Sequence, residues 1–181
     1  MQVEDKHYPQ AAALYKTLST VAIKSADIAS ALGGYLSAVI ATGNVAEMGR
    51  AADEVLASPY VTADLTREAN FAKARALQAD GHDDEALKLY RQVAGERTRI
   101  VSILYKQGKL KEAEAEVFAL AEQNSPYQYW TGKAFLILGD IYVQQNDAFQ
   151  AKATYQSIVD GYTDKTDGVV EEARRKMNEL K

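Results

Sequence analysis

The sequence predicts an all-α protein, a stack of antiparallel helical hairpins with about ten helices. Three observations indicate this fold. Ala, Leu, Glu, Lys and Gln, which favour helices, dominate the chain, and there are only three prolines. Val, Ile and Thr nowhere alternate with polar residues as they do in a half-buried strand. A turn residue, a small residue and a larger apolar residue also recur at a fixed spacing.

In the recurring pattern, a turn residue is followed five positions later by a small residue and nine positions later by a larger one. Gly or Asn tolerates the left-handed backbone between two antiparallel helices. Alanine suits the point of closest helix approach, and the larger side chain fills the space beside it on the same face. The pattern fits Gly81-Ala86-Tyr90, Gly108-Ala113-Val117 and Asn146-Ala151-Tyr155, fits Lys6-Ala11-Tyr15 with Lys at the turn, and fits Gly43-Met48-Ala52 weakly, with the sizes reversed.

The positions of the turn residues and of helix-start signals predict where each helix lies. The segment 8–22 resembles the second helix of a hairpin whose first helix is missing, and we therefore expect the C-terminal part of a longer bacterial repeat protein. Ser58-Pro59 and Ser125-Pro126 indicate helix starts, with an N-cap followed by a first-turn proline. We expect helices near 8–22, 25–42, 44–57, 63–80, 83–94, 96–107, 109–124, 126–145, 147–161 and 167–180.

The last expected helix differs from the others. Its apolar residues form one stripe, and charged residues cover much of the remaining surface. A terminal helix of a repeat stack must bury one face and expose the other to water, so this segment is predicted to be a C-terminal cap. The stripe consists of Val170, Ala173, Met177 and Leu180.

The stretch 134–142, Ala-Phe-Leu-Ile-Leu-Gly-Asp-Ile-Tyr, followed by Asn146, Ala151 and Tyr155, resembles the tetratricopeptide repeat. The turn positions 43, 81, 108 and 146 are separated by 38, 27 and 38 residues, whereas the family repeats every ~34 residues. The resemblance implies an irregular α-solenoid, in which the helical hairpins form a right-handed superhelical stack. It also implies one repeat domain over 1–181, with approximate units 1–22, 25–57, 63–94, 96–124, 126–161 and 167–181.

Nothing in the sequence predicts catalysis, a cofactor or a metal site. The absence of cysteine excludes disulfides, thiolate catalysis and cysteine-based zinc sites. His7 and His82 lack the spacing of a ligand set, and Gly33-Gly34 is not followed by the Lys-Ser/Thr of a phosphate-binding loop. We expect the two glycines to serve close helix packing or a local kink.

The charge pattern predicts no nucleic-acid binding, because the net charge is −4 and positive residues do not cluster without acidic neighbours. No apolar run approaches the ~18 residues of a membrane-spanning helix. The first residues do not form a signal peptide. The cytoplasm, or the periplasm after removal of a signal, both remain open as the compartment.

The family resemblance implies a protein–protein interaction scaffold in which the first helix of each hairpin lines a concave groove. The residues expected to line this groove are partly apolar and partly charged, which suits a hydrophobic or helical partner segment with charged edges. The alternatives are a structural or self-associating segment without its own ligand and, less favoured, an enzyme or small-molecule binder. Offsets from the turns assign the groove to Phe71, Arg75, Arg99, Ser102, Tyr105, Lys133, Leu136 and Asp140.

A cluster of aromatic residues opens the segment 126–145. Aromatic side chains fill the cores of helical repeats and are also enriched in protein-binding hot spots. We expect Trp130 and Phe135 to fill the core. For Tyr127 and Tyr129, which lie where the helix starts, core packing and partner binding are equally favoured.

Overall fold

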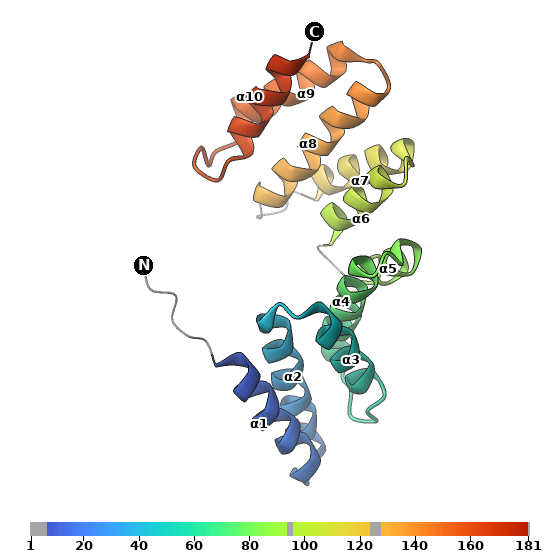
Figure 1. The fold of residues 1–181 in the computed structure, drawn as a ribbon, viewed down its shortest axis with the longest axis vertical. Coiled ribbons are helices and arrows are strands. Elements are labelled where there is room, and N and C mark those ends of the chain that lie inside the picture. The colour runs from blue at the N-terminus through green and yellow to red at the C-terminus, as the bar shows by residue number, and fades with distance from the viewer. Residues whose placement is uncertain (1–6, 94–95, 124–127, 181) are drawn as a thin grey trace. The chain divides into compact units, whose positions relative to one another are not determined.

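The computed structural model describes residues 7–93, 96–123 and 128–180, which form ten α-helices and no strand (Figure 1). The expected all-α class is confirmed. Nine helices begin and end within two residues of the expected positions, while the fifth stops at Tyr90 instead of continuing to residue 94. The helices are α1 (Tyr8–Val21), α2 (Ser25–Thr42), α3 (Val45–Leu56), α4 (Ala63–Ala79), α5 (Asp83–Tyr90), α6 (Arg97–Lys106), α7 (Leu110–Glu122), α8 (Gln128–Gln144), α9 (Ala148–Gly161) and α10 (Val169–Glu179).

The expected helix start at Ser58-Pro59 is wrong. Ser58 accepts a hydrogen bond from the backbone N–H of Tyr60 at 3.2 Å and so closes a turn instead of capping a helix. The cap of α4 is Thr62, whose hydroxyl accepts the backbone N–H of Leu65 at 3.2 Å. The second such signal, Ser125-Pro126, lies outside the described residues.

The chain divides into two compact units, Met1–Ala94 and Gly95–Lys181. Unit 1 contains α1 to α5, and unit 2 contains α6 to α10. The single repeat domain expected over 1–181 stays a prediction, and the two units are described separately below.

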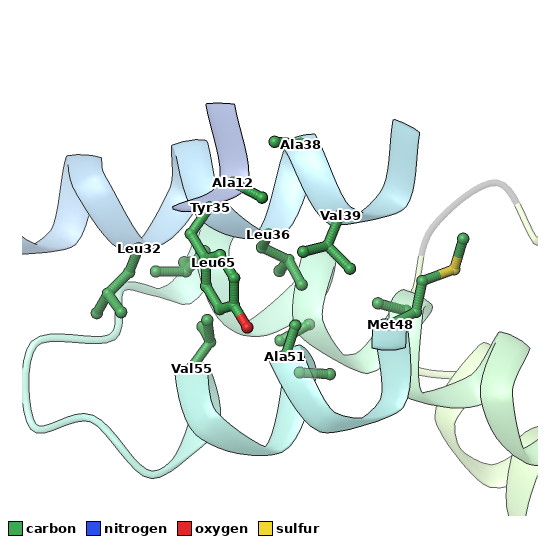
Figure 2. Close-up of a cluster of buried hydrophobic side chains, with 13 residues drawn as sticks. Ala12, Leu32, Tyr35, Leu36, Ala38, Val39, Met48, Ala51, Val55 and Leu65 are labelled. Atoms are coloured by element: carbon green, nitrogen blue, oxygen red, sulfur yellow. The ribbon is translucent and has the colours of Figure 1, made fainter. Parts of the chain in front are cut away.

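In unit 1, α1 packs along α2, α3 packs along α4, and α2 and α5 complete the stack against α3 and α4. Figure 2 shows Leu36 and Val39 of α2 pointing toward Ala51 and Met48 of α3. Gly34 allows α1 to approach α2 closely, because an added Cβ there would lie 2.6 Å from the Tyr15 ring. The expected packing role of the glycine pair is thus confirmed for Gly34.

In unit 2, α6–α7 and α8–α9 are hairpins, α6 and α7 also pack on α8, and α10 packs on α9 and α8. Burying the apolar face of α10 stabilises this end of the unit, as expected for a cap. The core beneath α10 is formed by Leu136, Ala151, Tyr155, Ile158, Tyr162, Val169, Val170 and Ala173.

All four predicted turn residues in the described part of the chain adopt left-handed backbone, with φ of 75° at Gly43, 82° at Gly81, 71° at Gly108 and 60° at Asn146. The last three turns share one backbone hydrogen bond, in which the N–H after the turn residue reaches back five positions. These bonds measure 2.8 Å from residue 82 to 77, 2.9 Å from 109 to 104 and 2.9 Å from 147 to 142. They satisfy carbonyl groups that the helix end would otherwise leave unpaired. Lys6, the fifth expected turn residue, lies outside the described residues.

The predicted contact alanines Ala86, Ala113 and Ala151 are fully buried. The larger residues four positions on, Tyr90, Val117 and Tyr155, are buried as well. In the last hairpin the ring of Tyr155 lies where a side chain at Gly139 would be, so the two helices meet backbone to ring. Met48 and Ala52, where the large and the small residue of the pattern are exchanged, are also buried, so the packing in this part of unit 1 accommodates the exchange.

We predict that Ala151→Leu lowers the free energy of unfolding by about 1–3 kcal/mol, because the added methylenes would overpack the α8–α9 contact. Ala153→Leu is the matched control, since Ala153 lies on the same helix and is exposed. Urea denaturation of both variants measures the difference. Equal stability of the two variants would contradict the assigned register.

Candidate protein-interaction surface

The structure places most of the predicted groove residues on the first helices of three hairpins. Phe71 and Arg75 lie on α4 in unit 1. In unit 2, Arg99, Ser102 and Tyr105 lie on α6, and Tyr129, Lys133, Leu136 and Asp140 lie on α8. Tyr127 lies outside the described residues.

Side chains near both ends of α6 connect it to α8. The Thr98 hydroxyl donates a hydrogen bond to the backbone carbonyl of Trp130 at 3.2 Å. At the other end, the Gln144 amide donates to the Tyr105 hydroxyl at 2.8 Å. Because Thr98, Ser102 and Tyr105 are spaced by four and three residues, they share the face of α6 that adjoins α8.

On α8, Tyr129, Lys133 and Asp140 are spaced by four and seven residues and therefore form one stripe. Lys133 and Asp140 of this stripe pair with side chains of α10. We call the surface formed by Ser102 and Tyr105 of α6 and by Tyr129, Trp130, Lys133 and Asp140 of α8 the inner surface of unit 2.

Asp140 is the electrostatic centre of the inner surface. Its carboxylate accepts hydrogen bonds from Lys176 of α10 at 2.8 and 2.9 Å and from the Tyr155 hydroxyl of α9 at 2.7 Å. The Asp140 and Lys176 side chains are only 23% and 19% exposed, so the ion pair is poorly screened by water. Burial, followed by the hydrogen bond to Asp140, raises the pKa of Tyr155. One carboxylate thus joins three helices.

A second ion pair joins the same two helices. The Lys133 ammonium lies 2.7 Å from the Glu172 carboxylate of α10, and both side chains are about one-third exposed. Two of the predicted groove residues, Lys133 and Asp140, are therefore held by the C-terminal helix.

Leu136 is not accessible to a partner. It lies in the hydrophobic core beneath α10 and is almost fully buried. Its offset from the turn residue Asn146 predicted an exposed side chain, because the prediction assumed that no other helix covers this face of α8. Packing of Val169, Val170 and Ala173 in the same cluster covers it instead.

Trp130 corrects a second expectation, because its side chain is 49% exposed and is not part of the core. It makes an edge-to-face contact with Tyr129, which is 41% exposed, and the ring centroids are 5.0 Å apart. Phe135 does pack against the core, as expected. The sequence did contain a signal for this exposure, because Trp130 lies in the first turn of α8, where fewer neighbouring side chains can cover it.

Phe71 and Arg75, the predicted groove residues of unit 1, contact each other. The Arg75 guanidinium carbon lies 5.7 Å from the centre of the Phe71 ring, and both side chains are half-buried. Such a cation–π contact fixes the arginine over an apolar surface while leaving its charge partly solvated.

A pocket of about 360 Å³ opens between α7, α8 and α9 of unit 2. Its lining combines apolar Leu120, Phe135 and Ile158 with polar Gln128, Thr131 and Ser157. A pocket of this kind can take an apolar side chain whose backbone bonds to the polar groups.

The chemistry that these groups offer is hydrogen bonding, ion pairing and aromatic contact. In residues 7–93, 96–123 and 128–180, no three His, Asp or Glu side chains are placed to hold a metal ion. None of the described helices has the length and apolar character needed to cross a lipid bilayer.

We predict that Asp140→Asn destabilises unit 2 by roughly 1–3 kcal/mol and increases amide exchange in α10, because Lys176 then lacks its counter-ion in a largely buried position. The matched control is Glu179→Gln. It removes the exposed ion pair with Arg175 on the same helix, which should change stability by less than ~0.5 kcal/mol. If exchange in α10 responds equally to both variants, Asp140 does not hold this helix.

A further prediction concerns alkaline pH. The Tyr142 hydroxyl donates to Glu114 of α7 at 2.7 Å, and burial together with this bond raises the pKa of Tyr142 to about 12. Between about pH 10 and 12, the unfolded chain loses this proton while the folded chain keeps it. The free energy of unfolding therefore falls as the pH rises through this range.

Tyr142→Phe should be less stable than the wild type near pH 8, by about 1 kcal/mol for the lost hydrogen bond. That deficit should shrink at about pH 11, because the variant has no such phenol to titrate. Urea titrations at both pH values measure it. A deficit that stays constant would show that Tyr142 is not the titrating group.

Comparison with known proteins agrees with this geometry. Residues 133–164 match the model of the family described as "Tetratricopeptide repeat", and they span most of α8 and all of α9. No protein of curated function matches the sequence.

Among solved structures, the chain is similar to the crystal structure of BtubC (BKLC) from P. vanneervenii. The similarity has a TM-score of 0.55 at 14% sequence identity and covers 96% of this chain and 87% of that chain. At this identity the likeness concerns the fold alone. The repeat match over 133–164, together with the hairpin geometry, relates this all-α chain to the tetratricopeptide repeat family.

Proposed function

We propose that the chain is a protein-interaction scaffold and that the inner surface of unit 2 binds a peptide or helix of a partner protein. The observation that carries this proposal is the half-exposed Tyr129–Trp130 pair on the first turn of α8. Two large aromatic side chains that contact each other in water, and not the core, are typical of a binding hot spot.

The polar groups beside this pair suit a partner with mixed character. Arg99, which pairs with Glu96 at 2.8 Å, and the hydroxyls of Ser102 and Tyr105 lie on neighbouring α6. An amphipathic segment could place its apolar residues on the aromatic rings and its charged edge along α6. Lys133 adds a cation that is partly open to water even while paired with Glu172.

Phe71 and Arg75 of unit 1 offer a second, smaller contact point. Their cation–π arrangement orders the guanidinium before any partner arrives, which lowers the entropy lost on binding. We propose that both units take part in recognition, each through the first helix of a hairpin.

Catalysis forms no part of the proposed function. The repeat family to which residues 133–164 belong generally acts by binding proteins. The net charge of −4 also disfavours nucleic acid as the partner. A structural or self-associating role is the second candidate, and the exposed apolar residues Leu14, Leu18 and Val21 of α1 favour it.

The partner can be found by site-specific photocrosslinking in cells. A crosslinking residue replaces Tyr129 in one chain and Lys152, which is exposed on α9, in the control chain. The proposal expects one partner segment to be captured from position 129 and not from position 152. Equal capture from both positions would contradict a specific inner surface.

The captured segment can then be synthesised and its affinity measured through Trp130, the single tryptophan of the chain. We predict that Tyr129→Ala weakens binding about 10- to 100-fold, because a hot-spot aromatic side chain contributes ~2 kcal/mol or more. Tyr105→Ala should weaken it less.

The control variant is Phe149→Ala, which removes an 82% exposed aromatic side chain on α9. This variant should bind like the wild type. Unchanged affinity in Tyr129→Ala, with the fold intact by circular dichroism, would remove the inner surface from the proposed function.

A further inference from the structure

Thr98 of α6 is a buried polar residue whose hydroxyl bonds to a neighbouring helix. Among the described residues, Thr98 and Thr154 are the two polar ones that are buried, at 7% and 9% exposure. The Thr154 hydroxyl donates to the carbonyl of Gln150 on its own helix α9 at 2.8 Å, as helical threonines commonly do. The Thr98 hydroxyl instead reaches the carbonyl of Trp130 in the first turn of α8, at 3.2 Å. A buried group of α6 thus holds the backbone that carries the Tyr129–Trp130 pair.

The first turn of α8 benefits from such support. The leading N–H groups of a helix have no partner within it, so helix starts open more readily than helix interiors. The rings of Tyr129 and Trp130 contact each other and remain half-exposed, so they do little to hold this turn. Close packing secures the chain at Gly132, where an added Cβ would lie 2.9 Å from the Tyr162 ring. The Thr98 hydrogen bond acts two positions nearer to the helix start, within the turn that carries the two rings.

The Thr98 bond adds to the helical bond of the same carbonyl and does not replace it. Within α8 the carbonyl of Trp130 also accepts the backbone N–H of Ala134, four residues on. A carbonyl oxygen has two lone pairs and can serve both donors. Opening of the first turn would leave the buried Thr98 hydroxyl without this acceptor, which makes opening less favourable.

We propose that Thr98 is a positioning residue of the binding surface, whose hydrogen bond keeps the first turn of α8 closed and so orders the Tyr129–Trp130 pair before a partner arrives. This inference rests on the proposed function, in which that pair is the hot spot. An aromatic pair on an ordered turn loses less conformational entropy on binding than one on a frayed turn. Thr98 acts through the α8 backbone, because its own side chain is buried.

Thr98→Val tests the proposal without a partner, because valine keeps the shape of the side chain and lacks the hydroxyl. We expect faster amide exchange at Ala134 and stronger acrylamide quenching of Trp130, the single tryptophan of the sequence. Exchange at Ala134 should be about 3- to 10-fold faster, the factor that one hydrogen bond of ordinary strength contributes to a local opening equilibrium. Thr98→Ala also lacks the hydroxyl and should act in the same direction, whereas Thr98→Ser retains it and should give wild-type values.

The matched control is Thr154→Val, which removes an equally buried hydroxyl whose hydrogen bond stays within α9. It should leave exchange at Ala134 and quenching of Trp130 as in the wild type, even if the overall stability of unit 2 falls. Unchanged exchange at Ala134 in Thr98→Val, or an equal acceleration in Thr154→Val, would overturn the proposal. Thr98→Ser exchanging as fast as Thr98→Val would overturn it as well.

Binding of the segment captured from position 129 separates this inference from the proposed function. We expect Thr98→Val to raise the dissociation constant of that segment about 3- to 10-fold, whereas Thr154→Val should bind like the wild type. Equal affinity in Thr98→Val and the wild type would retain the proposed function and overturn the positioning role. If position 129 captures no specific segment while exchange at Ala134 responds as expected, the proposed function fails and Thr98 still orders the first turn of α8.

Discussion

The close approach of neighbouring helices is the constraint on which the rest of this structure depends. Two helices can pack at short range only where one of them presents a hydrogen or a methyl group. Gly139 meets the Tyr155 ring, Gly34 meets the Tyr15 ring, and Ala151 is fully buried in the same hairpin as Tyr155. Each contact combines a position without bulk and a large ring that fills the space, which fixes both the distance and the rotation of the pair.

The same constraint shapes the candidate binding surface. Because the Tyr155 ring lies against Gly139, its hydroxyl reaches Asp140 on the next position of α8. Asp140 then accepts Lys176 from α10. The Asp140 carboxylate thus binds both the Tyr155 hydroxyl, whose ring packs on Gly139, and the Lys176 ammonium. The C-terminal helix is thereby held on the side of α8 where Leu136 is buried. Of the predicted groove residues on α8, Leu136 is consequently lost to the core, while Tyr129 stays exposed.

The two terminal helices of the described chain have different surfaces and therefore different consequences. α10 buries Val169, Val170 and Ala173 and turns charged residues to water, which stabilises unit 2 and keeps that side soluble. α1 buries Ala12 against α2 while Leu14 remains exposed. Helical repeats gain stability from each neighbour that covers an apolar face.

The amino-acid sequence by itself determined the helices, the turns and the contact alanines. These features depend on local geometry. Gly108 and Asn146 adopt the left-handed backbone that the turn between two helices needs. A residue five positions after the turn, such as Ala113, then faces the preceding helix and is buried. The tertiary structure alone decided which residues of the binding surface are accessible. Leu136 and Trp130 both lie on α8, yet the packing of α10 buries the first, while the position at the helix start leaves the second in water. Exposure depends on elements distant in sequence, and the spacing within one helix carries no information about them.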